Sequence, residues 1–574
     1  AVRPARVPGG KPQAEAIMPT AQQRALNKKL SQIFRMRGLT VRPDAMPLLY
    51  DFLETDDENW EAKLQALLAA VQREPLKDSA VDGAVIRKAL GQVAAQSARS
   101  TELPLEVIDA FAMTAVRYAA VRQAFLPAPA GSLHGPAESK QTMLALRLHL
   151  LEQRLKRNKL FKPPALSHGV ASKEHIVLTH LDALLGRKGS RVVLGLLTEK
   201  EEGQYYLEDT HSSVPLDLSQ AETQRGFFTR NSCVLMEGEV QPSGDFLVAT
   251  VGLPPHESRA DSITALAGLD LLHPPLDSSK PGGVTGGVPS VASKPEPAPV
   301  DPIVEQEAML IVMADVYLDQ AVVLERLADV LAGYEAVGAE MLRCGKELRP
   351  RASYFVFALC GNFVSPLGAS SHTKRSQLRG LYDQLARLIA AHPTLAEHAH
   401  FVLVPGPEDA TASSPDVLPR AALPESVAGE ALRAAARHCH LATNPARLSL
   451  CGQSVVIFRE QLMSKMRRSC VLPPNEVEAE GGTADLNAHL VQSLLDQAHL
   501  CPLPTTELAS YWQHDHAMWL HPSPDVLVLA DRHDQYQLPY EETLAFNPGS
   551  FASDFAWMVY RPCAKMEAER SSLS

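Results

Sequence analysis

Apolar residues recur at helical spacing through the first hundred residues of the chain. Between residues 22 and 95 they return at intervals of three and four, which is the period of an amphipathic helix. The apolar stripes fall at Leu26, Leu30, Ile33 and Phe34, then at Ala45, Leu48, Leu49 and Phe52, and then at Trp60, Leu64, Leu67 and Leu68. We therefore expect a small helical domain over residues 21–95. Residues 1–20 are rich in Pro, Gly and Ala, and we expect them to form a disordered tail.

Residues 96–165 are predicted to be a linker with connecting helices. Two apolar segments, 105–125 and 142–161, flank a Pro- and Gly-rich gap. The second segment is a basic amphipathic helix. Its apolar stripe should pack on the next domain while its charges stay in water, and we favour this role over contact with nucleic acid. The stripe is Leu146, Leu150, Leu151 and Leu155, and the charges are Arg147, Arg154, Lys156 and Arg157.

A two-residue period replaces the helical period between residues 176 and 255. The expected strands are Arg191–Glu199, Gly203–Asp209, Val214–Leu218, Ser232–Val240 and Gly244–Pro255. Five strands with Gly-bearing turns fit an OB-type β-barrel, which we place in residues 166–273. The stretch 176–255 holds six Lys and Arg against eleven Asp and Glu, so contact with protein is favoured over a basic groove for single-stranded nucleic acid.

An α/β domain is expected over residues 304–565. The preceding residues 274–303 are too rich in Pro, Gly and Ser to pack a core, and we expect a disordered insertion there. After them, continuous apolar runs of strand length alternate with helical patterns, as in a parallel sheet. The runs are Met309–Ala314, Tyr354–Leu359 and His400–Val404. Because the carboxyl ends of parallel strands meet at one edge of a sheet, Asp315, Asn362 and Asp409 should share one rim.

The composition limits the class of protein but does not indicate a particular reaction. With 574 residues the chain is expected to hold several domains, and its formal net charge of -11 argues against a main role in neutralising phosphates. The eight cysteines form no CxxC pair, which suits reduced thiols. No apolar run reaches the roughly 18 residues expected of a membrane-spanning helix.

The rim of the α/β domain has lost most of the residues that a metal site there would need. A binuclear phosphoesterase places acidic and imidazole ligands on successive strand ends, so that two cations share a bridging carboxylate. In the calcineurin-like order, Tyr317 stands where the first His is needed, Asn362 replaces the bridging carboxylate, and Asn444 stands at the place of a lone His. Two hard cations cannot be held by Asp315 and His533 alone. We therefore predict no metal, no cofactor and no enzymatic activity, with vestigial pocket positions at Asp315, Asn362, Asp409, Asn444, Asp531 and His533.

The carboxylates that remain on this rim would repel one another if nothing neutralised them. We expect an arginine to turn inward and pair with them, and Asn362 and Asn444 to act as neutral hydrogen-bond bridges. The carboxylates are Asp315, Asp319, Asp409 and Asp531, and the candidate arginines are Arg447, Arg459 and Arg532. Arg459 is also expected to form an ion pair with its neighbour Glu460 at a strand end.

The segments at these strand ends resemble the B-subunit family of eukaryotic replicative DNA polymerases. They are ADVYLD (314–319), GNFVSP (361–366), VPGPEDA (404–410), NPARLSLCGQSVVIFRE (444–460), LLDQAHLCPLP (494–504), LHPSPDVLVLADRHDQY (520–536) and NPGSF (547–551). Within the family, the likeness is greatest to the DNA polymerase epsilon branch. It is carried by IDAF (108–111), QRLKRNKLF (153–161), GLLTEKEEGQYYLED (195–209) and VGLPPHESR (251–259). Ala314, where the family usually has Ser, departs from the pattern.

This resemblance implies a multidomain α+β protein that is a non-catalytic accessory subunit of DNA polymerase epsilon in the nucleus. It implies that the OB domain and an inactive calcineurin-like phosphoesterase domain together grip the C-terminal domain of the catalytic subunit. It also implies that the N-terminal domain is like the lid of AAA+ proteins and connects to replicative helicase components. DNA is expected as part of the complex, and direct contact with it is left open.

Two alternatives to this function stay open. One is an active metal-dependent phosphoesterase or nuclease, and the other is the B-subunit of another replicative polymerase. If the accessory role holds, we expect residues 170–561 alone to bind the catalytic subunit, because the N-terminal domain should fold separately.

Overall fold

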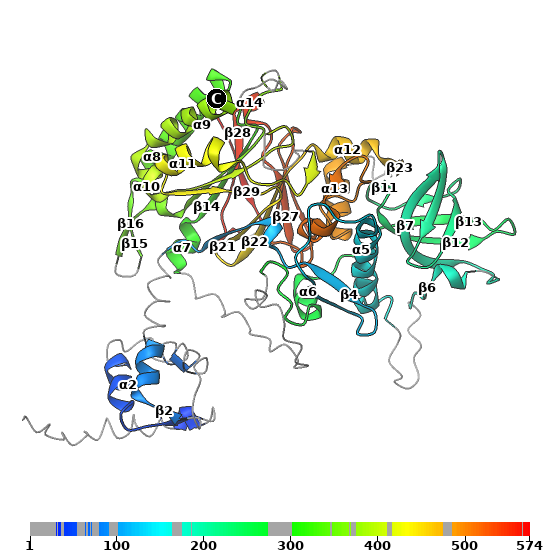
Figure 1. Ribbon diagram of the computed structural model, residues 1–574, viewed down its shortest axis with the longest axis horizontal. Coiled ribbons are helices and arrows are strands. Elements are labelled where there is room, and N and C mark those ends of the chain that lie inside the picture. The colour runs from blue at the N-terminus through cyan, green and yellow to red at the C-terminus, as the bar shows by residue number, and fades with distance from the viewer. Residues whose placement is uncertain are drawn as a thin grey trace, which may run out of the picture. The chain divides into compact units, whose positions relative to one another are not determined.

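The chain forms two compact units, Ala1–Ser100 and Thr101–Ser574. The computed structural model (Figure 1) describes residues 30, 32–35, 39–53, 64, 67–68, 71, 80–90, 102–162, 175–184, 186–273, 301–344, 347–366, 368, 375–409, 416–473, 485–564 and 566–573. The tail predicted over residues 1–20 lies outside the described residues, as does the predicted insertion up to residue 300. Among the helices described, none combines the length and the apolar character needed to cross a bilayer.

The first unit buries most of the predicted apolar stripe positions that the structure describes. Its described elements are helix α2 (Met46–Leu53), helical residues 83–90, and strands β1 (Thr40–Val41) and β2 (Ala80–Val81), which pair in parallel. The core holds Leu30, Phe34, Ala45, Leu49, Leu64, Leu67 and Leu68, with Val71, Val81, Ile86 and Ala89. Ile33 and Leu48 are partly buried against it, and Leu26 and Trp60 lie outside the described residues. The helical period did not predict the β1–β2 pair.

A closed five-stranded barrel follows in the second unit, built from the five strands that the alternation predicted. They are β7 (Arg191–Glu201), β8 (Gln204–Glu208), β9 (Ser213–Asp217), β12 (Cys233–Val240) and β13 (Phe246–Gly252). Their order is β13-β12-β7-β8-β9, and a pairing between β9 and β13 closes the barrel. Apolar residues at alternate positions fill the interior, among them Val193, Leu197, Leu207 and Val248.

The rest of the second unit is a sandwich of two six-stranded sheets. The first sheet has the order β20 (His438–Leu441), β18 (His400–Val404), β17 (Phe355–Cys360), β14 (Met309–Ala314), β28 (Ala556–Tyr560) and β29 (Ala568–Ser572). The second has the order β26 (Tyr536–Tyr540), β27 (Thr543–Asn547), β25 (Val526–Ala530), β22 (Gln453–Arg459), β21 (Ala446–Leu450) and β3 (Leu105–Ile108). Strands β14, β17, β18 and β20 are parallel to one another, as are β22, β25 and β27.

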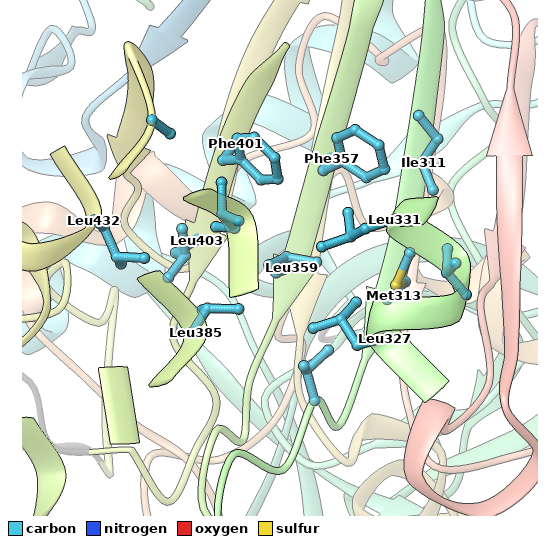
Figure 2. Packing of buried hydrophobic residues seen from close by; sticks show 14 of the residues in the cluster. Ile311, Met313, Leu327, Leu331, Phe357, Leu359, Leu385, Phe401, Leu403 and Leu432 are labelled. Atoms are coloured by element: carbon cyan, nitrogen blue, oxygen red, sulfur yellow. The ribbon is translucent and has the colours of Figure 1, made fainter. Parts of the chain in front are cut away.

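Helices cover both outer faces of the sandwich (Figure 1). Those on the first sheet are α8 (Ala321–Gly338), α9 (Arg375–Ala390), α10 (Pro393–His398) and α11 (Glu430–Ala435), and those on the second are α12 (Leu462–Arg468) and α13 (Leu486–Asp496). Ile311 and Met313 of β14 face the helices, while Leu310 and Val312 face the second sheet. Figure 2 shows Ile311 and Met313 beside Leu327 and Leu331 of α8. Burial on both faces explains why β14 is a continuous apolar run.

The remaining elements are short and border these layers. They are β4 (Val116–Ala119), β5 (Ala124–Pro127), β6 (Leu178–Thr179), β10 (Glu222–Thr223), β11 (Phe228–Thr229), α6 (Arg259–Ala265), α7 (Pro302–Glu307), β15 (Met341–Cys344), β16 (Glu347–Pro350), β19 (Val417–Leu418), β23 (Cys470–Leu472), β24 (Ala509–Ser510) and α14 (Phe551–Asp554).

The predicted connecting helices are corrected at residues 105–125, which form strands β3, β4 and β5 instead. Strand β3 pairs antiparallel with β21, with Leu105 opposite Leu450. The backbone N–H and C=O groups of β3 therefore form their hydrogen bonds with a distant strand and not within a helix. The predicted limits of the α/β domain, 304–565, also change. Strand β3 from the predicted linker belongs to the sandwich, α7 begins at Pro302, and β29 extends the first sheet beyond residue 565.

The second predicted helix is present as α5 (Glu138–Arg157), but two of its charges are not in water. The exposed fraction is 7% for Arg147 and 4% for Arg154. Arg147 lies 2.5 Å from Asp515, and Arg154 donates to the carbonyl oxygens of Asp496 and Pro255 at 3.1 and 2.8 Å. These arginines are buried because they satisfy acceptors of the OB and sandwich domains.

Helix α13 joins the barrel to the sandwich through three polar side chains. Phe227 N donates to Ser493 Oγ at 2.7 Å, and Cys233 N donates to Gln497 Oε1 at 2.9 Å. Gly226 N lies 2.9 Å from His489 Nδ1 and donates to it. The barrel therefore meets the sandwich through backbone groups held by one helix.

Candidate functional site

Five strands of the two sheets end at one place. In the first sheet, Asp315, Asn362 and Asp409 follow the carboxyl ends of the parallel strands β14, β17 and β18. In the second sheet, Arg459 is the last residue of β22, and Asp531 comes directly after the parallel strand β25. The topology therefore brings residues from both sheets to a common rim, as the strand pattern predicted for the first sheet.

Asp315 lies at the centre of this rim and contacts two guanidinium groups. It is fully buried and has a left-handed backbone with φ of 58°. Arg459 Nη2 donates to its Oδ1 at 2.6 Å, and Arg532 Nε donates to its Oδ2 at 3.3 Å. Burial by itself lowers the pKa of Arg459, but Asp315 outweighs this effect and the pKa is raised above its ordinary value. Asp315 is therefore paired with two guanidinium groups that come from the second sheet and the segment after it.

Arg459, at the end of β22, bonds residues at the ends of three other strands, β14, β17 and β25, through its guanidinium group. Besides Asp315, its Nε donates to the carbonyl oxygen of Gly361, which follows β17, and its Nη1 donates to that of Ala530 in β25 at 3.0 Å. The guanidinium fork supplies several donors in a fixed plane, and here three of its nitrogen atoms bond at once. The side chain thus acts as an internal cation between the two sheets.

The two asparagines of the rim differ in how completely they are bonded. Asn444 Nδ2 donates to the carbonyl oxygens of Pro405 and Arg459 at 2.9 and 2.7 Å, and its Oδ1 accepts from Arg459 N at 3.1 Å. Asn362 Oδ1 accepts from Glu408 N at 3.0 Å, while its buried Nδ2 has no partner among the described residues. Asn444 therefore fills the bridging role that we expected, and Asn362 fills half of it.

Backbone N–H groups, rather than arginine side chains, bind the other two buried carboxylates. Asp409 accepts from Phe363 N and from Gly406 N, both at 2.8 Å. Burial raises the pKa of Asp409 to about 6, against the lowering effect of these two hydrogen bonds. Asp531 accepts from Met463 N at 3.1 Å, at the start of α12.

Three predicted members of the rim take no part in its buried network. His533 is exposed. Asp319 is also exposed and accepts from Ser365 N and Oγ at 2.9 and 2.6 Å. Arg447 donates to the carbonyl oxygen of Ala517 at 3.0 Å rather than to a carboxylate of the rim. Of the three candidate arginines, Arg459 and Arg532 therefore bond a carboxylate of the rim, and Arg447 is buried without bonding one.

The rim holds paired charges but offers few side chains that could serve as ligands of a metal ion. Within the described part of the chain, no group of three or more His, Cys, Asp and Glu side chains is placed to hold a metal ion. A cation approaching Asp315 would have to displace the guanidinium groups of Arg459 and Arg532.

Three family models match this chain in order along its length. "DNA polymerases epsilon N terminal" matches residues 22–93, "DNA polymerase epsilon subunit 2-like, OB-fold domain" matches 137–255, and the model of the DNA polymerase alpha/epsilon B-subunit matches 310–538. The DNA polymerase epsilon B-subunit of Arabidopsis thaliana is 34% identical over 565 residues, which cover 96% of this chain and 99% of that protein. This chain belongs to the DNA polymerase epsilon B-subunit family.

Animal members of the family match almost as fully. DNA polymerase epsilon subunit 2 of Homo sapiens is 33% identical over 95% of this chain and 98% of its own, and that of Drosophila melanogaster is 29% identical over 94% and 96%. A solved archaeal phosphodiesterase covers 46% of this chain and 99% of its own at 12% identity, with a TM-score of 0.23, a likeness too weak to support a shared fold.

In this member of the epsilon B-subunit family, Glu460 does not pair with Arg459 as we expected. Arg420 Nη2 lies 2.5 Å from one oxygen of Glu460, and Lys465 Nζ lies 2.9 Å from the other. Burial acts to raise the pKa of Glu460, but Arg420 and Lys465 outweigh it and lower the pKa to about 2. The neighbours Arg459 and Glu460 thus serve two separate ion pairs.

A third buried ion pair, which was not predicted from the sequence, joins α5 to the sandwich. Arg147 donates to both oxygens of Asp515, from Nη2 at 2.5 Å and from Nε at 3.0 Å. His499 Nε2 lies 3.3 Å from the same carboxylate. Although burial would raise the pKa of Asp515, Arg147 and His499 hold it well below its ordinary value. Amphipathic spacing in α5 indicated a packed helix but gave no signal for buried charge.

Proposed function

We propose that this chain is a non-catalytic accessory subunit of DNA polymerase epsilon. The proposal is supported by relatives that are named subunits of that polymerase and match nearly the whole chain. The absence of catalysis is supported by one observation in particular, the bonding of Arg459 and Arg532 to Asp315. A guanidinium cannot lower the pKa of a bound water as a metal ion does, and the three nitrogen atoms of the Arg459 guanidinium are already bonded to acceptors of the protein.

The proposed partner is the C-terminal domain of the catalytic subunit, gripped by the OB barrel together with the sandwich. In support of this, α13 and α5 tie the two domains through hydrogen bonds and a buried ion pair, so they can present one surface. Residues 21–95 are proposed to form a domain like the lid of AAA+ proteins, contacting replicative helicase components. We place this work in the nucleus, with DNA as part of the complex.

Activity and assembly are tested together on the full chain. The purified protein is given manganese with single-stranded DNA or a generic phosphodiester, and no turnover is expected. In parallel, it is co-expressed with the polymerase epsilon catalytic subunit, and stoichiometric co-purification is expected. Turnover that disappears in Asp315→Ala would favour an active phosphoesterase or nuclease. Failure to co-purify, with binding to another replicative polymerase instead, would favour the other alternative.

A further inference from the structure

A polar cavity of about 370 Å³ lies where the barrel meets the sandwich, and none of the residues that line it belongs to the rim at Asp315. Its wall includes His256, from the segment after β13, and Gln492 and Asp496 of α13. Tyr540, Glu541 and Glu542 of the turn between β26 and β27 complete the acidic side. Glu541 and Glu542 are exposed, whereas the exposed fraction of Asp496 is 3%. The cavity therefore has two carboxylates in solvent and one withdrawn from it.

Asp496 differs from the other buried carboxylates of the described residues in the kind of partner that it has. Each of those has a cation or backbone N–H partners: Asp315, Asp515 and Glu460 pair with arginines, and Asp409 and Asp531 accept from the backbone. Asp496 Oδ1 instead accepts from the phenol of Tyr540 at 3.0 Å, and Gln492 is its other side-chain partner. The cation nearest to this carboxylate, Arg154, acts on it without forming an ion pair, and a buried carboxylate that lacks an ion pair is costly, so this position favours a positive ligand.

The charges around the cavity are negative on balance. Arg154 lies behind Asp496 but donates to its backbone oxygen at 3.1 Å, and no ion pair joins it to the carboxylate within 4.0 Å. Arg259, next to Glu542, lies 3.8 Å from Asp525 and is shared with that acid. Burial lowers the pKa of His256 to about 4, so it is neutral near pH 7.

The chemistry of the wall suits an organic cation better than a metal ion. In the described part of the chain no three acidic, imidazole or thiol side chains are placed to hold a metal. The carboxylates are instead spread around a cavity large enough for part of a small ligand. A guanidinium presents donors in several directions, bonds more than one carboxylate, and packs well beside an aromatic ring such as that of Tyr540. A compact ammonium group does these things less well.

We propose that this cavity binds an arginine side chain presented by a protein partner, with Asp496, Glu541 and Glu542 as its acceptors. The long aliphatic stem passes the exposed glutamates and carries the guanidinium toward the buried aspartate. This inference does not rest on the proposed function, because it follows from the cavity and its charges alone.

Binding at the cavity is measured with N-acetyl-arginine amide as the probe and the full chain as the receptor, by saturation-transfer NMR. N-acetyl-glutamine amide is the neutral control. The double variant Glu541→Gln, Glu542→Gln removes the two exposed charges. Its matched control is Glu201→Gln, Glu202→Gln, which neutralises an adjacent exposed pair at the end of β7 on the barrel.

We expect the dissociation constant of the arginine probe to rise about tenfold in the cavity variant, as for the loss of about 1.4 kcal/mol of binding energy. It should be unchanged in the Glu201, Glu202 control. Equal affinity in the wild type and the cavity variant would overturn the proposal. So would wild-type binding of the glutamine probe as tightly as the arginine probe.

A pH series adds a readout specific to Asp496. Burial raises the pKa of Asp496 to about 7, with Glu541 adding to the rise and Arg154, Tyr540 and Gln492 opposing it. A bound guanidinium favours the ionised form, so affinity should increase up to about tenfold from pH 6 to pH 8. The increase should vanish in Asp496→Asn, which keeps an acceptor for Tyr540. A pH dependence that persists in this variant would contradict the role of Asp496.

Discussion

Arg459 and Asp315 form an ion pair with 2.6 Å between Nη2 and Oδ1, and both side chains are almost wholly excluded from solvent. Asp315 follows β14 of the first sheet, and Arg459 ends β22 of the second. The pair therefore connects the two sheets at the edge where their strand ends meet. Its guanidinium also bonds the carbonyl oxygens of Gly361 and Ala530.

Removing the charge of Asp315 should destabilise the protein strongly. Asp315→Asn keeps a residue type that tolerates a left-handed backbone but leaves the buried guanidinium of Arg459 without its anion. We expect the free energy of unfolding, from urea denaturation, to fall by about 3–5 kcal/mol. Asp319→Asn, at an exposed carboxylate on the same loop, should cost less than about 1 kcal/mol. Equal losses in the two variants would show that the Asp315 pair has no special weight.

Stability should depend on the ionisation of Glu460 in acid. The folded pKa of about 2 lies below the ordinary value of 4.5, so the folded state favours the charged form. The contribution is therefore complete above about pH 4.5 and is lost as the pH falls towards about 2. A shift of this size corresponds to about 3 kcal/mol. Between pH 5 and pH 2.5, the unfolding free energy of the wild type should therefore fall further than that of Glu460→Gln, by most of this amount. Parallel curves of unfolding free energy against pH for the two proteins would contradict this.

A methyl group at position 406 should disturb the rim. A Cβ on Gly406 would lie 2.2 Å from Asn362 Oδ1 and 2.7 Å from its backbone nitrogen. Gly406→Ala should therefore lower the thermal unfolding temperature, since the backbone cannot easily move away. Gly380→Ala is the matched control, because its Cβ meets no atom within 4 Å on helix α9. The control should raise stability by about 0.5–1 kcal/mol, and a similar gain at Gly406 would be evidence against a tight rim.

Truncation at residue 170 should fail, in contrast to the expectation from the sequence. It removes β3 from the second sheet and α5 with Arg147, so the buried Asp515 loses its cation. Loss of that ion pair alone should cost about 3–5 kcal/mol. We expect residues 101–574 to express as a folded protein and residues 170–561 to aggregate, judged by size-exclusion chromatography. A folded, monomeric 170–561 fragment would contradict the structural role of α5.

The sequence predicted the parts of the fold in which local pattern and burial agree. The run at Met309–Ala314 is apolar throughout because both of its faces are buried. The barrel strands place alternate residues in the barrel interior, although the other face of β7 is also buried at Leu194 and Leu196. The placement of Asp315, Asn362 and Asp409 followed from strand ends alone. Strand β3 was missed because its backbone partner, β21, lies far away in the sequence.

Pairing of charges was harder to predict than their presence on the rim. Successive side chains of a strand point to opposite faces, which is a reason to expect different partners for Arg459 and Glu460. Which arginine bonds the rim carboxylates depends on where other acceptors lie. Arg447, for example, donates to the carbonyl oxygen of Ala517 instead. The burial of Arg147 and Arg154 was not predicted because arginines are rarely buried, and only the tertiary structure supplies their partners.

Metal binding at Asp315 is tested most directly by the thermal unfolding temperature of the full chain with manganese and with EDTA. Anything that binds only the folded state raises this temperature, and a ligand at a given concentration raises it more if it binds more tightly. Because Arg459 and Arg532 already bond both oxygens of Asp315, we expect the two temperatures to agree. An unfolding temperature that rises by several degrees with manganese and falls with EDTA, with no such difference in Asp315→Asn, would show that the rim holds a metal ion. That result would contradict the proposal that the subunit is non-catalytic and that Arg459 is the cation bound to Asp315.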